Sequence, residues 1–271
     1  MKEVLLPPPH WPTNHTGLDG RRSSTPRTQS FGEASDKLRV TETRGRQKIF
    51  ALGPEELLGP LNDVERKFAP QEIFAAGPME IPLPRPRVAI VGSRKPSEKG
   101  RDAATEIAGM LSKKGVVIVS GLAAGIDTAA HKAAIEAKGR TVAVLGTSLD
   151  NVYPKENSQL QKEIATNHLA ISQFPIGYPT RPENFVMRNR TMALISNASV
   201  IVEAGDTSGS LHQGWEALRL GRTLFIWKSI VGDTSLTWPE QMIRHGALEL
   251  DDPRRVLDVL PSPQRIVKIS V

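Results

Sequence analysis

From Arg87 onward, short apolar segments rich in β-branched residues alternate with longer segments that have helical spacing. Apolar segments of about five residues are typical of strands that are buried on both faces of a parallel sheet. We expect strands at 88–91, 116–120, 142–145, 169–172, 200–202 and 223–227. We expect helices at 99–114, 128–138, 156–167, 189–196, 212–220 and 253–260. This alternation predicts an α/β fold with a doubly wound, mostly parallel sheet.

The remaining residues differ in composition from this part. Residues 1–45 are rich in Pro, Ser, Thr, Gly and Arg without a regular period, so we expect a disordered N-terminal tail. Residues 46–86 contain a short apolar pattern and then a Pro-rich stretch, which predicts a short lead-in segment. The main domain is then expected at 87–261, followed by a C-terminal tail at 262–271.

Glycine and serine residues follow several expected strands directly, at the points where helices are expected to begin. Free backbone N–H groups at a helix N-terminus attract anions, and ligands of such folds bind beyond the carboxyl ends of the strands. Any one such turn is also explained by ordinary turn chemistry. Together they predict a phosphate-binding surface that includes Gly92, Ser93, Arg94, Ser120, Gly121, Gly125, Ser208, Gly209 and Ser210.

Further basic residues lie near expected helix starts. Arg188-Asn189-Arg190 is expected to open a helix, and its guanidinium groups can bind phosphates. The same groups can instead fix two loops through a carboxylate such as that of Glu203. Lys155 follows Tyr153, whose ring can stack on a base while the lysine binds the phosphate. A plain helix start with a solvated lysine explains this segment equally well.

Asp127 and His131 are spaced as i and i+4, which is compatible with a metal site or with acid–base chemistry. We favour a structural explanation, in which Asp127 caps the helix and His131 bonds to a neighbouring loop. We therefore expect no metal, no cofactor and no catalytic residue.

The overall charge says little about the folded part of the chain. Nine Lys/Arg against five Asp/Glu lie in residues 1–48, so +4 of the formal +6 falls there. The chain has no cysteine, which excludes disulfides and thiolate sites and suits a reducing compartment. No apolar run is long enough to cross a bilayer and no signal peptide is evident, so we expect a cytoplasmic protein without a membrane partner.

Several motifs follow one another in a fixed order along the chain. They are Gly92-Ser93-Arg94, Ser120-Gly121-Leu122-Ala123 through His131, Leu149-Asp150 through Leu160, Arg188-Asn189-Arg190, Val202-Glu203-Ala204 and Ser208-Gly209-Ser210-Leu211. Together they resemble the DprA/Smf family of DNA-processing proteins, over about residues 87–250 with a weaker lead-in from about residue 48. The chain departs from the family pattern at Gln173, at Gln213-Gly214 and at Trp227-Lys228.

This resemblance implies an extended Rossmann-like domain and a homodimer that binds single-stranded DNA. It also implies protection of that DNA from nucleases and loading of a RecA-type recombinase, as in natural transformation. In the family the Gly-Ser-Arg loop lines the DNA groove, which implies that role for Ser93 and Arg94. The resemblance extends the role with less support to Lys155, Arg188 and Arg190.

Two other functions remain open at this point. Related domains include nucleoside-monophosphate phosphoribohydrolases, so a nucleotide-binding sensor or hydrolase, for example in phage defence, is the main alternative. Such enzymes use a Glu three residues after their glycine loop, where this chain has Gln213, and Glu216 follows a further three residues on. The third hypothesis is an interaction module whose interface is formed by Trp215, Trp227 and Trp238.

Overall fold

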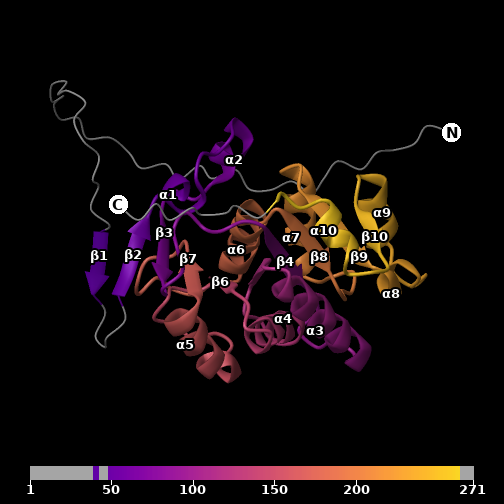
Figure 1. Ribbon diagram of the computed structural model, residues 1–271, viewed down its shortest axis with the longest axis horizontal. Coiled ribbons are helices and arrows are strands. Elements are labelled where there is room, and N and C mark those ends of the chain that lie inside the picture. The colour runs from indigo at the N-terminus through magenta and orange to yellow at the C-terminus, as the bar shows by residue number, and fades with distance from the viewer. Residues whose placement is uncertain (1–38, 43–47, 263–271) are drawn as a thin grey trace. The chain divides into compact units, whose positions relative to one another are not determined.

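The computed structural model describes residues 39–42 and 48–262, and all of them belong to one compact unit of the chain, residues 38–271. Among these residues, ten strands form a single sheet in the order β1-β2-β3-β7-β6-β5-β4-β8-β9-β10, which can be followed across Figure 1. The strands are β1 (Arg39–Glu42), β2 (Lys48–Leu52), β3 (Ile73–Ala76), β4 (Arg87–Val91), β5 (Val117–Ser120), β6 (Thr141–Leu145), β7 (Leu169–Ser172), β8 (Ala198–Ile201), β9 (Thr223–Trp227) and β10 (Leu248–Leu250).

The part of the sheet from β7 to β10 is parallel throughout, whereas β1, β2 and β3 add antiparallel strands at one edge. The chain first adds β5, β6 and β7 on one side of β4, and then returns to place β8 on its other side. In the β4–β8 pairing Val88 lies opposite Ala198 and Val91 opposite Ile201. This reversal between β4 and β8 confirms the doubly wound, mostly parallel α/β fold and creates a switch point where a ligand crevice is expected.

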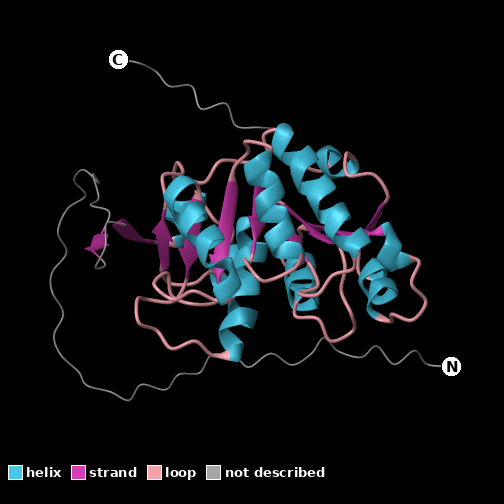
Figure 2. Cartoon of the chain, turned by 90° about the horizontal axis from the view of Figure 1, so that it is seen from below, coloured by secondary structure: helices cyan, strands magenta, loops and turns pink. Residues whose placement is uncertain are grey.

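Helices cover both faces of the sheet (Figure 2). Val88 and Ile90 of β4 pack in the same cluster as helices α3 and α4, whereas Ala89 and Val91 face the layer that contains α6. This alternation follows from the two-residue period of a strand that is buried on both faces. The helical elements are α1 (Pro54–Leu58), α2 (Asp63–Phe68), α3 (Glu98–Lys113), α4 (Ile126–Glu136), η1 (Lys155–Asn157), α5 (Ser158–Asn167), α6 (Pro182–Ile195), α7 (Ser210–Arg219), α8 (Lys228–Val231), α9 (Trp238–Arg244) and α10 (Arg255–Asp258).

The segment before β4 was expected to be a short lead-in, but it contributes strands to the sheet. Strands β2 and β3 extend the sheet beyond β7, and β1 pairs with β2. The expectation of no regular structure over 1–45 is therefore wrong for Arg39–Glu42, while residues 1–38 and 263–271 lie outside the described residues. Arg87 anchors the segment, because its buried guanidinium donates to the carbonyl oxygens of Leu83 and Ile195.

Two of the three tryptophans proposed as an interface are in the core. Trp227 and Trp238 are 8% and 4% exposed, and the indole nitrogen of Trp238 donates to the Ala204 carbonyl oxygen at 3.2 Å. Trp215 is half-buried and its ring lies 5.2 Å from the ring of His245. The interface hypothesis is therefore wrong for the pair that is buried. In the described residues, no helix is long and apolar enough to cross a membrane.

Candidate functional site

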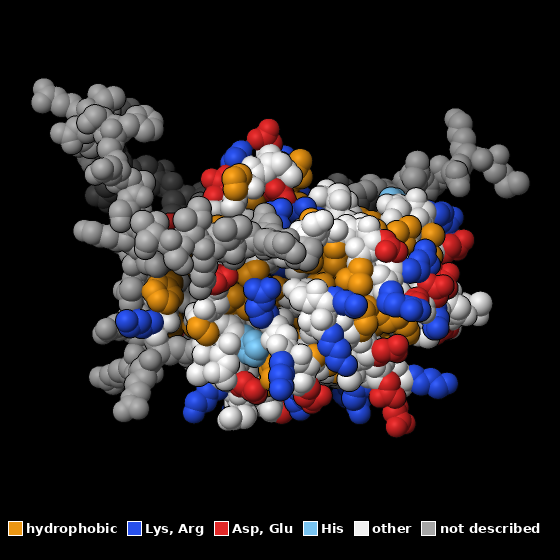
Figure 3. Space-filling view, in the orientation of Figure 1, with side chains coloured by type: hydrophobic (Ala, Val, Ile, Leu, Met, Phe, Trp, Pro, Cys, Tyr) orange, Lys and Arg blue, Asp and Glu red, His pale blue; other side chains and the backbone are white. Residues whose placement is uncertain are grey.

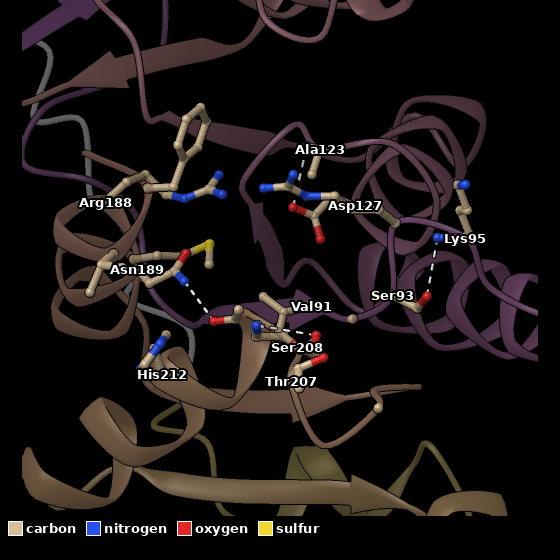
Figure 4. A pocket seen from close by; sticks show the side chains of 18 residues that line it. Val91, Ser93, Lys95, Ala123, Asp127, Arg188, Asn189, Thr207, Ser208 and His212 are labelled. Atoms are coloured by element: carbon tan, nitrogen blue, oxygen red, sulfur yellow. Dashed lines mark hydrogen bonds between the residues drawn. The ribbon is translucent and has the colours of Figure 1, made fainter. Parts of the chain in front are cut away.

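A cavity of about 580 Å³ lies beyond the carboxyl ends of β4 and β8, at the switch point of the sheet. It is enclosed by the loop after β4, the start of α4, helix α6 and the loop that leads into α7. Figure 4 shows Arg188, Asn189 and His212 on one side of this cavity and Ser93 and Lys95 on the other. Of the predicted residues, those that line the cavity are Gly92, Ser93, Arg94, Arg188, Asn189, Ser208, Gly209 and Ser210.

The other predicted residues do not line the cavity. Ser120 is buried and donates from its hydroxyl to the Ile90 carbonyl oxygen at 2.7 Å, so it joins two strands. Lys155 is exposed in η1. Gly121 and Gly125 instead shape the loop between β5 and α4, whose contacts set the position of the cavity wall.

The loop after β4 is held by backbone hydrogen bonds from two neighbouring elements. The Ser93 N–H donates to the Glu203 carbonyl oxygen at 2.6 Å, and the Ser93 carbonyl oxygen accepts from the Ile126 N–H at 3.1 Å. A side chain at Gly92 would lie 2.7 Å from that same Glu203 oxygen, so only glycine fits there. The loop is therefore fixed while Arg94 and Lys95 remain exposed.

Glu203 has a different role from the one expected. Its carboxylate accepts from the Ser97 N–H at 2.9 Å and from the Ser97 hydroxyl at 2.6 Å. Ser97 in turn caps α3 by accepting from the Gly100 N–H at 3.0 Å. The hypothesis that Glu203 is the partner of Arg188 or Arg190 is wrong, because the carboxylate is oriented toward the start of α3.

Asp127 holds the loop that precedes its helix. Its Oδ2 accepts from the N–H groups of Gly121 and Ala123 at 3.1 and 3.3 Å, and Gly125 is the N-cap residue of α4. The prediction that Asp127 caps the helix was therefore wrong in detail, although its role is structural. Burial raises the pKa of this carboxyl, against the opposing effects of Arg188 and of these hydrogen bonds.

His131 lies deeper in the core. Its Nδ1 donates to Thr141 Oγ1 at 2.7 Å, since that hydroxyl itself donates to the Ile118 carbonyl oxygen. The partner is thus on strand β6 and not on a loop, which corrects the expectation. Burial lowers the pKa of His131 to about 3, so the ring is neutral at physiological pH. Among the described residues, no group of three or more His, Asp or Glu side chains is placed to hold a metal.

Arg188 is 5% exposed and lies near the middle of α6, so the prediction that 188–190 open a helix was wrong. Its Nη1 donates to the carbonyl oxygens of Gly121 and Val144, the latter at 3.0 Å. Burial lowers the pKa of the guanidinium, and the nearby Asp127 raises it. The Nε of Arg188 has no hydrogen-bond partner among the described residues, while the side chain lines the cavity. Arg188 therefore fixes the wall and retains an unused donor.

Of the two residues that follow Arg188, Asn189 fixes the other wall of the cavity and Arg190 does not line it. The Asn189 side chain donates to the Gly209 carbonyl oxygen at 2.9 Å, and this ties α6 to the loop before α7. In that loop the hydroxyls of Ser208 and Ser210 lie 2.7 Å apart. Arg190 pairs with Glu216 at 3.3 Å, and Glu216 also binds Arg219. Arg190 therefore takes part in a structural ion-pair group.

Sequence reasoning missed Phe185, which lies at the rim of the cavity. The Arg94 guanidinium carbon lies 5.8 Å from the Phe185 ring centroid, and the Tyr153 ring lies 5.2 Å from the same ring. Tyr153 is 46% exposed. These three side chains form an aromatic and cationic rim, in which Tyr153 and Arg94 are exposed and Phe185 is half-buried, and which we call the Tyr153–Phe185–Arg94 rim. The available signal was a phenylalanine three residues before Arg188, in the stretch that leads into the Arg188-Asn189-Arg190 motif.

The surface charge outside the cavity is mixed. Lys and Arg side chains alternate with Asp and Glu over the face seen in Figure 3. In the cavity the balance is different, because its lining includes Arg94, Lys95 and Arg188, whereas the acidic side chain that contributes to it, Asp127, is buried. The local arrangement favours an anion more than the overall charge of the chain does.

Comparison with known proteins gives a consistent set of matches. The sequence profile of a family described as DNA recombination-mediator protein A matches residues 58–261. The DNA processing protein DprA of Bacillus subtilis is 34% identical over 192 residues, which cover 71% of this chain and 65% of that protein. DprA of Streptococcus pneumoniae is 38% identical over 179 residues, which cover 66% of this chain and 63% of that protein. The chain thus spans somewhat less than two thirds of either relative.

Solved structures agree in fold. The X-ray structure of DprA from Streptococcus pneumoniae has a TM-score of 0.65 at 32% identity, and the match covers 77% of this chain and 73% of that one. DNA processing protein A from Helicobacter pylori, whose structure describes a single-stranded DNA binding mode, has a TM-score of 0.65 at 25% identity. That match covers 74% of this chain and 93% of that one.

Proposed function

This chain belongs to the DNA recombination-mediator protein A family, and on that basis we propose that it is a DNA-processing protein that binds single-stranded DNA and does not act as an enzyme. In this proposal the cavity at the switch point holds backbone phosphates. The bases lie along the Tyr153–Phe185–Arg94 rim. The Helicobacter pylori relative, whose structure describes binding of single-stranded DNA, supports the choice of ligand.

One observation carries the proposal, namely that an exposed arginine and an aromatic ring, with a second ring packed against the first, lie at a cavity lined by backbone and hydroxyl groups. Stacking of a base on an aromatic side chain contributes about 1–3 kcal/mol and tolerates any sequence. The faces of the bases are free only in an unpaired strand. Arg94 can then bind a phosphate in a bidentate manner, as guanidinium groups commonly do.

The phosphates are expected to bind without a dedicated base-reading group. Arg94 and Arg188 provide charge, and the hydroxyls of Ser93, Ser208 and Ser210 provide donors. Binding should therefore depend strongly on salt and only weakly on sequence. Gly209 leaves its backbone open to the strand, since no atom lies within 4 Å of a Cβ there, while Gly92, Asn189, Ser120, Gly121 and Gly125 act by holding the loops in place. Lys155 lies near the exposed Tyr153, and we include it as a contact outside the cavity.

Hydrolysis of a nucleotide is supported less well by the same residues. Gln213 occupies the position where the phosphoribohydrolases have a glutamate, and its side chain is buried and donates to the Ser199 hydroxyl at 2.7 Å. The carboxylate of Glu216 binds Arg190 and Arg219 and is itself buried. We therefore rank a nucleotide-binding sensor or hydrolase second.

We extend the proposal to the processes that the family resemblance implies. A strand held in the cavity is shielded from nucleases, and a homodimer would present it in the cytoplasm to a RecA-type recombinase, as in DNA uptake by natural transformation. Nuclease protection of a labelled oligonucleotide and the molar mass of the protein by light scattering test the first two steps. Assembly of a recombinase on that oligonucleotide tests the third.

The binding proposal is tested by fluorescence anisotropy with labelled oligo-dT and with a duplex of equal length at two salt concentrations. We expect preference for the single strand, and a loss of roughly tenfold or more in affinity for Arg94→Ala, because a charged hydrogen bond contributes about 1.5–3 kcal/mol. Arg140→Ala is the matched control, since Arg140 is exposed just before the amino end of β6. Equal affinity of a folded Arg94→Ala protein would refute the proposal. Release of free base from nucleoside monophosphates by the parent protein would favour the alternative.

A further inference from the structure

A second hollow, of about 480 Å³, adjoins the cavity on the other side of the loop after β4. It lies over the starts of α3 and α4, two helices that pack against each other. Arg94 and Lys95 line both the cavity and this hollow, so the two form one continuous surface across the loop. The hollow is lined by Arg94, Lys95, Pro96, Arg101, Gly125, Thr128, Ala129 and Lys132.

The lining is basic without compensating acidic groups. Its four charged residues are all cationic and exposed, and none of them is in an ion pair within the part of the chain that the structure describes. Asp127 and Glu203, which are acidic residues nearby in the fold, are already occupied by backbone and hydroxyl donors. These four cations are Arg94, Lys95, Arg101 and Lys132.

The floor of the hollow is formed where the loop before α3 packs against the start of α4. A Cβ at Gly125 would lie 2.6 Å from Pro96 Cδ, so the two loops touch at this point. The neighbouring side chains Thr128 and Ala129 are small, and the Thr128 hydroxyl is turned away to the Ala123 carbonyl oxygen at 2.7 Å. An extended chain of phosphates can therefore lie over these small residues, with the longer cationic side chains beside it.

We propose that this hollow binds the phosphates of the same single strand where it leaves the cavity, an inference that rests on the proposed function. Arg101 and Lys132 are the residues particular to this second site, and Arg94 and Lys95 connect it with the first. Continuity with the cavity favours a polynucleotide over a separate acidic protein, since a protein ligand would not need the two sites to share a wall. The protein then contacts a longer stretch of strand than the cavity alone can hold.

The test compares oligo-dT ligands of increasing length, from about 3 to about 12 nucleotides, a range that spans typical single-strand sites. Affinities are measured by anisotropy for the parent and for Arg101→Gln/Lys132→Gln. The matched control is Lys113→Gln/Arg140→Gln, which removes one Lys and one Arg that are exposed on the side of the sheet where the amino ends of the strands lie. Arg94→Ala is measured in parallel as a variant of the cavity itself.

We expect the parent to gain affinity with length, and the Arg101→Gln/Lys132→Gln protein to bind the shortest ligand like the parent but to lose most of that gain. With the longest ligand its salt slope should fall by about 0.7 for each phosphate that the variant no longer neutralises. The inference is overturned if this variant gains affinity with length as the parent does, or if the control loses as much. In either case dependence of the shortest ligand on Arg94 would still support the proposed function. Absence of binding to the parent at every length would overturn both.

Discussion

Gly125 lies in the loop before α4 and packs closely against the loop that carries Arg94. Its replacement by alanine therefore tests how the position of that loop affects binding. Gly125 has φ of +81° and ψ of −122°, a conformation outside the left-handed helical region that costs a residue with a Cβ roughly 1–3 kcal/mol. The added Cβ would also meet the Ser93 carbonyl oxygen, and would lie 2.6 Å from Pro96 Cδ and 2.8 Å from the Arg94 carbonyl carbon. Two of these are backbone atoms, so the loop itself must move.

Gly221 provides a control that also has a positive φ but lacks the collision. Its φ is +68° and no atom lies within 4 Å of the Cβ that alanine would add. Gly221→Ala should therefore lower the free energy of unfolding by only about 1–2 kcal/mol. For Gly125→Ala a packing cost of about 1–3 kcal/mol is added to the strain, which gives a total loss of about 2–6 kcal/mol.

Urea unfolding followed by circular dichroism measures both losses, and anisotropy with oligo-dT measures binding at a temperature where both variants are folded. Gly125→Ala should bind at least roughly tenfold more weakly than Gly221→Ala, because displacement of the Arg94 backbone removes a charged hydrogen bond to the strand. The reasoning is refuted if Gly125→Ala is no less stable than Gly221→Ala and binds like the parent.

Three further predictions concern polar side chains that hold the site or lie in the core beneath it. Arg188→Met should lower the free energy of unfolding by about 2–5 kcal/mol in urea titrations, because two buried carbonyl oxygens lose their donor; wild-type stability would contradict this. The neutral His131 ring, with its pKa near 3 when folded and an ordinary value of 6.5, contributes stability above pH 6.5. That contribution falls by about 1.4 kcal/mol per unit as the pH drops toward 3, and His131→Gln should lack this slope, so equal slopes would disprove it. Glu203→Ala should weaken oligo-dT binding and lower the melting temperature, since Ser97 and the start of α3 lose their acceptor; thermal scans with Glu98→Ala as control decide the point.

The sheet was predictable because buried parallel strands leave a strong apolar pattern. The bounds of β7 and β9 agree with the prediction at both ends, and β4 and β6 differ by one residue at their start. Helix α6 was not predictable over its first half. It buries Asn184, Arg188 and Asn189, so polar residues occupy the positions where an apolar period would mark a helix.

The site was predictable as a set of loops, whereas the pairing of side chains within it was not. Phosphate-type turns at the ends of parallel strands must meet, so Ser93 and Ser208 could be placed together from their order in the chain. Which side chain holds which loop depends on burial. Arg188 and Asp127 both turned inward to backbone groups of the β5–α4 loop, which no spacing in the sequence reveals.

The location of the strand is tested most directly by photocrosslinking of oligo-dT that carries 5-iododeoxyuridine, followed by peptide mapping. The expected crosslinks fall on Phe185, which lines the cavity, and on Tyr153, whose ring lies 5.2 Å from the Phe185 ring. They should disappear when unlabelled oligo-dT is added in excess. Crosslinks that fall instead at the amino ends of the β-strands, around residues 113–116 or 138–140, would show that the DNA strand does not bind at the switch point.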